Sequence, residues 1–220
     1  MSADIKSRHR IFMKKRWKII IFVALLGIVI YHSFYFEDLE ARKSALAKQE
    51  FNATEYVRNF WQKLLNKRDG APEAAEIYTL LNRDIPAAIK NYSTKSNDVS
   101  STHFFLLRGQ GKAVSITEDG VRLSLDKTKE ESQIFIATDL IFGNAVRNAS
   151  GLVNSDQFDS MDYNHVSEAI NAKVMNEVIP TFRDQVQEQS TVLFFGAGQV
   201  FESDPQIRPW KIIPIYLEVK

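Results

Sequence analysis

The first pattern along the chain is an uncharged apolar run that extends from Ile19 to Phe36. Seven basic residues and one acid precede it within residues 1–18. Eighteen helical residues span roughly 27 Å, close to the ~30 Å hydrocarbon core of a bilayer. A basic flank keeps its end of a membrane helix in the cytoplasm. The pattern predicts a basic cytoplasmic tail over residues 1–18 and a transmembrane anchor over residues 19–36, with the remaining chain outside the cytoplasm.

Two other interpretations of the apolar run stay open. A cleaved signal peptide has a shorter apolar core that is followed closely by a small-x-small site. Here the site Ala45-Leu-Ala47 comes only after several charged residues. The other alternative is a helix buried in the core of a soluble domain. The seven basic residues that precede the apolar run argue against it. The uncleaved anchor is the interpretation we carry forward.

Residues 37–102 are expected to form a helical stalk and extension. Residues 37–50 are rich in Ala, Glu, Lys and Leu, which is typical of a polar continuation of the membrane helix. Asn52 and Glu55 then have the spacing of a capping box. The apolar positions that follow recur with helical period, at Val57, Phe60, Trp61, Leu64 and Leu65. Shorter helices are expected around residues 77–81 and 84–92, and a loop over residues 93–102.

From His103 onward the apolar period changes from 3.6 to 2, which predicts strands. Five are expected, at residues 104–116, 121–126, 133–138, 191–202 and 210–219, with a helix over 163–189 capped by Asp162 and kinked or restarted at Pro180. Gly109 and Gly111 suggest a bulge or bend in the first strand, and Pro214 an edge or bulge in the last. This order predicts an α+β fold: a five-stranded OB-like Greek-key barrel over residues 103–220, with a helix between strands 3 and 4. An open α+β sheet is the alternative.

Charge and composition exclude several classes of function. The chain has no cysteine, which excludes disulfides, thiolate chemistry, iron–sulfur ligation and a lipid-modified cysteine. Residues 19–220 hold 21 basic and 26 acidic residues, so the expected outer part is acidic and lacks the basic footprint of nucleic-acid binding. Four phenylalanines on strands are interpreted as core residues rather than stacking platforms: Phe104, Phe105, Phe194 and Phe195.

Candidate chemistry is sparse. The four histidines are scattered without metal-ligand spacing, and no nucleotide or hydrolase motif is present, so we expect no metal, cofactor or catalytic residue. His165 with Asp162 is more typical of a solvated histidine at a helix start than of a catalytic pair. One segment, residues 139–148, interleaves apolar side chains with Asn144 and Arg147, as a small polar-ligand site does. Arg147, Asn144 and Asn171 are therefore the predicted ligand or partner residues.

A purely structural interpretation of the same segment also stays open. In it, the guanidinium of Arg147 pairs with Asp156 or Asp159 and holds the loop in place.

Several motifs, in their order along the chain, resemble the bacterial domain-of-unknown-function 2291 family. They are Phe51-Asn-Ala-Thr-Glu-Tyr-Val-Arg-Asn-Phe-Trp61, Arg108-Gly-Gln-Gly111, Phe142-Gly-Asn-Ala-Val-Arg147, the helix residues 166–171 and the terminal strand 210–219. The resemblance implies a predicted periplasmic lipoprotein whose genes are often associated with sugar-type ABC transport, and it supplies no catalytic residues. This sequence departs from the family in having the run from Ile19 to Phe36 in place of a lipidated cysteine, and Asn148 where an acid is expected.

Together these observations predict a non-enzymatic, single-pass protein of the bacterial inner membrane, with its N-terminus in the cytoplasm and its C-terminal domain periplasmic or extracellular. The expected role is an accessory or binding module of a sugar ABC-type transport or envelope system. Expected partners are the membrane, envelope or transporter proteins and a small polar ligand, but no nucleic acid. Two alternatives remain: a scaffold of a secretion-type complex, or an enzyme that acts on envelope saccharides.

Overall fold

The computed structural model describes residues 51–94, 101–126, 131–202 and 208–220, together with Phe22 and Leu26. The chain divides into two compact units, Met1–Glu50 and Phe51–Lys220. In the first unit Phe22 and Leu26 are helical and exposed, and the rest of the predicted tail, anchor and stalk lies outside the described residues. Among the helices that are described, none is long and apolar enough to cross a membrane.

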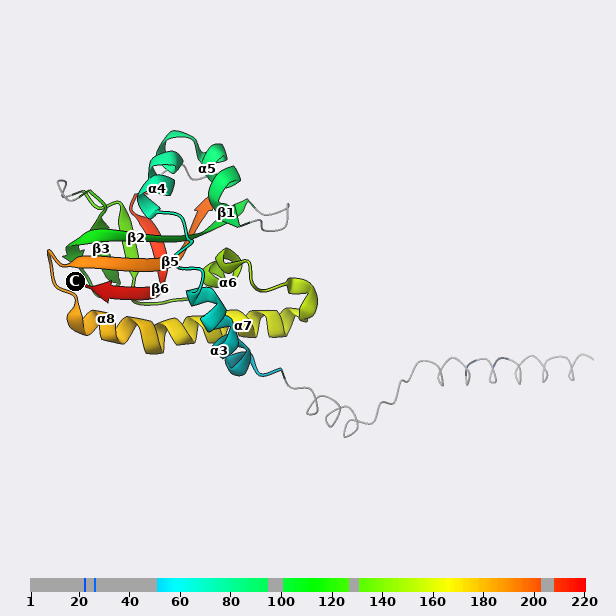
Figure 1. Cartoon of the computed structure of the whole chain (residues 1–220). Coiled ribbons are helices and arrows are strands. Elements are labelled where there is room, and N and C mark those ends of the chain that lie inside the picture. Colours follow the sequence, from blue (N-terminus) through cyan, green and yellow to red (C-terminus); the bar gives the residue numbers. More distant parts are fainter. Residues whose placement is uncertain (1–21, 23–25, 27–50, 95–100, 127–130, 203–207) are drawn as a thin grey trace, which may run out of the picture. The chain divides into compact units, whose positions relative to one another are not determined.

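Five strands of the second unit close a barrel: β2 (Thr102–Ile116), β3 (Gly120–Ser124), β4 (Ile134–Ala137), β5 (Thr191–Phe201) and β6 (Trp210–Val219). Their order is β2-β3-β4-β6-β5, and a pairing between β2 and β5 completes the ring. Only the pairing of β4 with β6 is parallel among these strands. The mixed α+β fold predicted from the sequence is confirmed, and a helical connection joins the third and fourth barrel strands (Figure 1).

The five predicted barrel strands are all present, but the sheet has a sixth strand that the sequence did not predict. The additional strand is β1 (Ser93–Thr94), which lies where the sequence predicts a loop. It pairs antiparallel with Phe104 and Phe105 of β2. A two-residue strand carries no alternating pattern of its own, so its existence depends on this tertiary pairing.

The long strand β2 is bulged, but not at its glycines. The register with β3 shifts between Ala113 and Ser115. Gly111 instead permits a close approach, because a Cβ atom there would lie 2.9 Å from the Cβ of Leu123. On β6 the register with β5 shifts next to Pro214, as predicted for that residue.

Three helices precede the barrel strands and pack into the same compact unit. They are α3 (Ala53–Leu65), α4 (Ala74–Arg83) and α5 (Ile85–Tyr92). Asn52 caps α3 by accepting a hydrogen bond from the amide of Glu55 at 3.0 Å, as the sequence predicts. Asp84 caps α5 in the same way, accepting from the amide of Ala87 at 3.0 Å.

The connection from β4 to β5 contains α6 (Ala145–Ser150), a 3-10 turn (Ser155–Gln157), α7 (Ser160–Lys173), a π-helical turn (Val174–Val178) and α8 (Ile179–Gln185). Asp159 caps α7, not Asp162, and accepts hydrogen bonds from the amides of Met161 and Asp162 at 2.8 Å. Pro180 is the second residue of α8, which continues the π-helical turn directly. The predicted kink or restart at this proline therefore falls within one turn of the change from α-helix to π-helix.

The core consists of two hydrophobic clusters. One joins the barrel strands to α4 and α5, and the other joins the barrel to α3, α6 and α7. In the view of Figure 1 these two groups of helices lie on opposite sides of the barrel. All four strand phenylalanines are at most 4% exposed, so they are core residues as predicted: Phe104, Phe105, Phe194 and Phe195.

Candidate functional site

Arg147, the main residue predicted to bind a ligand, is buried in α6 and only 5% exposed. Its Nη1 donates to the carbonyl oxygen of Tyr163 at 2.6 Å, and its Cζ lies 3.5 Å from the centroid of the Tyr163 ring. Burial lowers the pKa of the guanidinium, and Tyr163 opposes that shift. No ion pair joins Arg147 to Asp156 or Asp159 among the described residues, and the Asp159 carboxylate caps α7, but the structural role suggested for Arg147 agrees with its contacts to Tyr163. Arg147 clamps α6 to α7.

Asn144 lies at the end of the loop between β4 and α6, and Asn171 contacts the same loop. Asn144 is exposed and makes no side-chain cap for α6. Asn171 donates from Nδ2 to the carbonyl oxygen of Gly143 at 2.9 Å. Arg147 turns toward Tyr163, and none of the three residues lines the pockets of about 760, 430 and 330 Å³ that the described residues form. Their role in ligand binding stays a prediction.

The histidines of the outer region pair with acids on the surface. His165 Nδ1 lies 3.9 Å from Asp162 Oδ1, and His103 Nε2 lies 2.8 Å from Glu202 Oε1. No cluster of three or more histidines and acids that could hold a metal ion occurs among the residues the structure describes.

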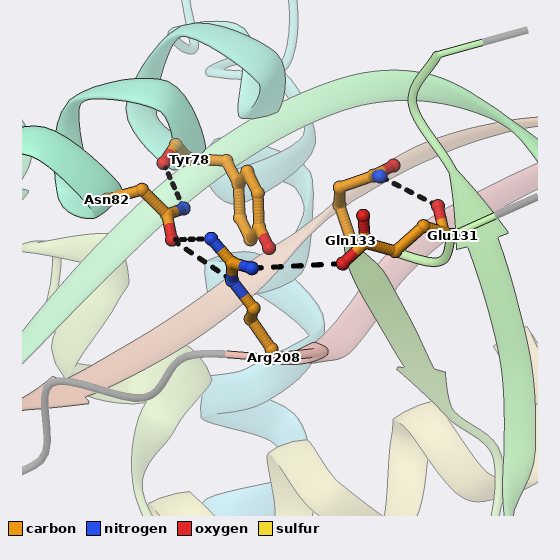
Figure 2. Close-up of polar contacts among 5 residues, drawn as sticks. All are labelled: Tyr78, Asn82, Glu131, Gln133 and Arg208. Carbon is orange, nitrogen blue, oxygen red and sulfur yellow. Dashed lines mark hydrogen bonds and ion pairs between the residues drawn. The ribbon is translucent and has the colours of Figure 1, made fainter. Parts of the chain in front are cut away.

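A polar cluster surrounds Arg208, immediately before β6 (Figure 2). Its Nε and Nη2 donate to Asn82 Oδ1 at 3.4 and 3.2 Å, and its Nη1 lies 3.8 Å from Glu131 Oε1. Asn82 donates to the Tyr78 carbonyl, and Gln133 to the Glu131 carbonyl, each at 2.7 Å. Pockets of about 760 and 330 Å³ flank Arg208. Since the ion-paired side chains are more than 60% exposed, the cluster is a solvated network that ties α4 to the β3–β4 connection.

A pocket of about 430 Å³ lies where the segment before α4 crosses β2, β5 and β6. The amide of Arg108 donates to the Pro72 carbonyl at 3.0 Å, which places Glu73 beside Arg108. Arg108 Nε is 2.9 Å from Glu73 Oε1, but the pair lacks the alignment of a hydrogen bond. Arg108 Nε is a buried atom, whereas no hydrogen bond or ion pair to a described residue occupies Nη1 or Nη2 of the half-exposed side chain, so these two groups can donate to a ligand. Volumes of this size are typical of small-molecule sites.

Close packing of β2 against its neighbours shapes this pocket. A Cβ atom on Gly109 would lie 2.8 Å from Phe194 Cζ and 3.1 Å from Ala74 Cβ. Glycine therefore allows β5 and α4 to approach β2 next to Arg108, and rigid strands rather than a loop position the arginine.

The other polar side chains of the pocket bring positively charged, negatively charged and hydroxyl groups next to one another. The Cζ of Arg68 lies 4.5 Å from the centroid of the Tyr216 ring, and its Nε is 3.5 Å from Asp69 Oδ1. The Tyr216 hydroxyl donates to Glu218 Oε2 at 2.8 Å. The pKa of Tyr216 is raised, mainly by this hydrogen bond and to a smaller extent by burial, whereas Arg68 acts to lower it. Donors and acceptors thus face the same small volume.

The sequence analysis missed this pocket. Its side chains come from four segments that are far apart in the chain, so no spacing could have joined them. The one visible signal is the run Arg108-Gly-Gln-Gly111, in which two polar residues alternate with glycines in a strand.

The closed barrel with its parallel β4–β6 pairing and a helix before β5 defines the protein as a member of the OB-fold class. A crystal structure of an OB-fold protein from Thermotoga maritima MSB8 superposes with a TM-score of 0.72 at 25% sequence identity, covering 78% of this chain and 100% of that one. None of the curated proteins matches the chain.

The chain belongs to the family described as "Predicted periplasmic lipoprotein (DUF2291)", whose model matches residues 24–218. The resemblance stated from the sequence motifs is therefore confirmed at the level of the family. The matched range includes both the barrel and the helices that precede it.

Proposed function

We propose that the protein is a non-enzymatic extracytoplasmic binding module that takes a small, neutral, hydroxyl-rich ligand in the pocket beside Arg108. The observation that carries this proposal is the guanidinium of Arg108, which lines a pocket of about 430 Å³ and whose Nη1 and Nη2 have no partner among the described residues. The family description, a predicted periplasmic lipoprotein, supports a location outside the cytoplasm.

The charge pattern of the pocket supports a neutral ligand. Arg68 and Arg108 each have an acid within 4 Å, and Glu218 accepts a hydrogen bond from Tyr216. A strongly charged ligand would meet one repulsive partner for each attractive one. A hydroxyl group both donates and accepts, so it can satisfy a carboxylate and a guanidinium in turn. A sugar has this chemistry.

The contacts of the pocket carboxylates with Arg108 and Tyr216 support binding without catalysis. General acid–base catalysis needs a positioned group free to exchange a proton with the substrate. The carboxylate of Glu73 is held by Arg108, and that of Glu218 by a phenol. Asp69 is 87% exposed, which gives it no sheltered environment.

A membrane tether and a transport role complete the proposal. The 220 residues contain no cysteine to carry a lipid, whereas residues 19–36 have the length and polarity of a membrane helix. The apolar run would anchor the module in the inner membrane with residues 51–220 in the periplasm. Such a module suits an accessory of a sugar ABC-type transport or envelope system.

A thermal-shift screen of residues 51–220 tests the binding. This unit contains both hydrophobic clusters, so it is expected to fold without residues 1–50. The panel holds sugars, sugar phosphates, nucleotides and metal ions. A ligand at 100 times its Kd adds about 2.7 kcal/mol, which raises the melting temperature by roughly 5–10 °C.

Arg108→Met keeps the length and apolar volume of the side chain while it removes the donors. We expect this variant to lose the shift, and the exposed Arg58→Met to keep it. A flat screen on folded protein, or a shift that Arg108→Met retains in full, would overturn the proposal.

A further inference from the structure

The loop between β4 and α6 displays two large apolar side chains to solvent. Leu140 is 69% exposed and Phe142 is 73% exposed. Ile141, which stands between them, is 8% exposed and belongs to the hydrophobic cluster that joins the barrel to α3, α6 and α7. Burial of Ile141 therefore turns its two neighbours outward.

This loop is held in place by specific contacts. Asn171 donates from Nδ2 to the Gly143 carbonyl at 2.9 Å, and the Thr138 amide donates to the Asp119 carbonyl at 2.9 Å. Leu140 has a φ of 49°, in the left-handed region that a branched, bulky residue seldom adopts. A backbone held in that region by its surroundings is more common at functional sites than elsewhere.

Two cations lie beside aromatic rings of this surface, which are the exposed Phe142 and the half-buried Phe135. Lys211 Nζ is 5.7 Å from the centroid of Phe142, and the Cζ of Arg122 is 5.7 Å from that of Phe135. Cross-strand pairing aligns Arg122 with Phe135, and Phe135 with Lys211. Neither cation takes part in an ion pair within the described ranges. Unpaired cations next to exposed apolar side chains are typical of a surface that meets anionic lipid.

We propose that Leu140, Phe142, Lys211 and Arg122 form a docking surface for an anionic phospholipid bilayer. The two apolar side chains enter the boundary between headgroups and acyl chains, and the two cations meet the phosphate groups. Scattered exposed apolar residues need no explanation. Here, however, two of the most exposed lie two residues apart on a fixed loop and have cations as neighbours.

The sequence before the domain argues for the bilayer as the occupant, and this step rests on the membrane anchor proposed above. Fourteen residues, 37–50, separate the end of the apolar run from the folded unit. Even fully extended they reach no further than about 50 Å. The tether would therefore keep the folded unit near the bilayer and add to an affinity that the loop already has by itself.

Vesicle co-sedimentation of residues 51–220 tests the docking surface without the anchor, so a failure of the proposed anchor would not affect the result. The probes are vesicles of phosphatidylglycerol mixed with phosphatidylcholine, and vesicles of phosphatidylcholine alone. We expect sedimentation with the anionic vesicles that weakens as salt is added. The double variant Leu140→Ser, Phe142→Ser should lower the partition coefficient at least tenfold.

Met161→Ser is the matched control, because Met161 is 68% exposed but lies at the start of α7. It should leave partitioning unchanged. Three results would overturn the proposal: no sedimentation of the wild-type unit with anionic vesicles, equal sedimentation with neutral vesicles, or an equal loss in Met161→Ser. A concentration-dependent dimer that the double variant abolishes would also overturn it, by assigning the surface to a second copy.

Discussion

Replacing Arg147 with methionine tests whether this residue is a structural clamp or a ligand-binding group. Methionine keeps an apolar side chain of similar length and removes the guanidinium. The loss includes the 2.6 Å hydrogen bond to the Tyr163 carbonyl, worth about 1.5–3 kcal/mol for a charged donor. It also includes the contact with the Tyr163 ring at 3.5 Å, worth about 1–2 kcal/mol when desolvated.

Relief of desolvation offsets part of this loss, because burial already disfavours the charged form of Arg147. We therefore expect the free energy of unfolding to fall by about 2–4 kcal/mol. Urea unfolding at pH 7, followed by tryptophan fluorescence, measures the change as a lower midpoint at constant slope. The exposed Arg58→Met serves as control and should stay within about 0.5 kcal/mol of the wild type.

The reasoning would be refuted if Arg147→Met were as stable as Arg58→Met. If the same variant then lost a ligand-induced shift, Arg147 would be the binding residue that the sequence analysis predicts.

Two further predictions concern packing and ionisation. In Gly198→Ala the added Cβ would lie 2.6 Å from ring atoms of Trp210, so we expect thermal denaturation to show a loss of about 1–3 kcal/mol. Gly70→Ala is the control, because the nearest atom to its added Cβ would be 3.9 Å away. Equal losses of stability in both variants would contradict the packing argument. Glu218→Gln should lower the pKa of Tyr216 toward 10.0, measured by tyrosinate absorbance against Tyr216→Phe. Because the pKa of Tyr216 is raised in the folded state, the stability that the protonated phenol contributes is lost only as the pH rises above about 10. If Tyr216 titrated at the same pH in Glu218→Gln as in the wild type, the Glu218 hydrogen bond would be excluded as the cause.

Local patterns predicted the barrel strands well because alternation reports which side chains face the core. The helix α3, which Asn52 caps, was also predicted, because a capping residue and a helical period are both local features of the sequence. The strand β1 was missed because two residues are held only by their partners on β2. The π-helical turn before Pro180 was missed because the prediction located the break at the proline itself, whereas the missing N–H also affects the preceding turn.

The candidate site was harder to predict than the fold. Arg147 looked like a ligand residue because it is a charged group among apolar ones, and sequence alone does not show that Tyr163 meets it from the next helix. The pocket beside Arg108 depends on the approach of Glu73 and Tyr216, which are far apart in the sequence. Only the closed barrel brings these segments together.

Saturation-transfer ¹H NMR of residues 51–220 with a mixed panel of simple sugars tests whether the pocket beside Arg108 binds a sugar without altering it, because one sample reports both binding and chemical change. The account predicts transfer to at least one sugar, its loss in Arg108→Met but not in Arg58→Met, and no new resonances after overnight incubation. Transfer that Arg108→Met leaves intact would contradict the proposed pocket. New sugar resonances that appear with time would contradict a binding module without catalysis.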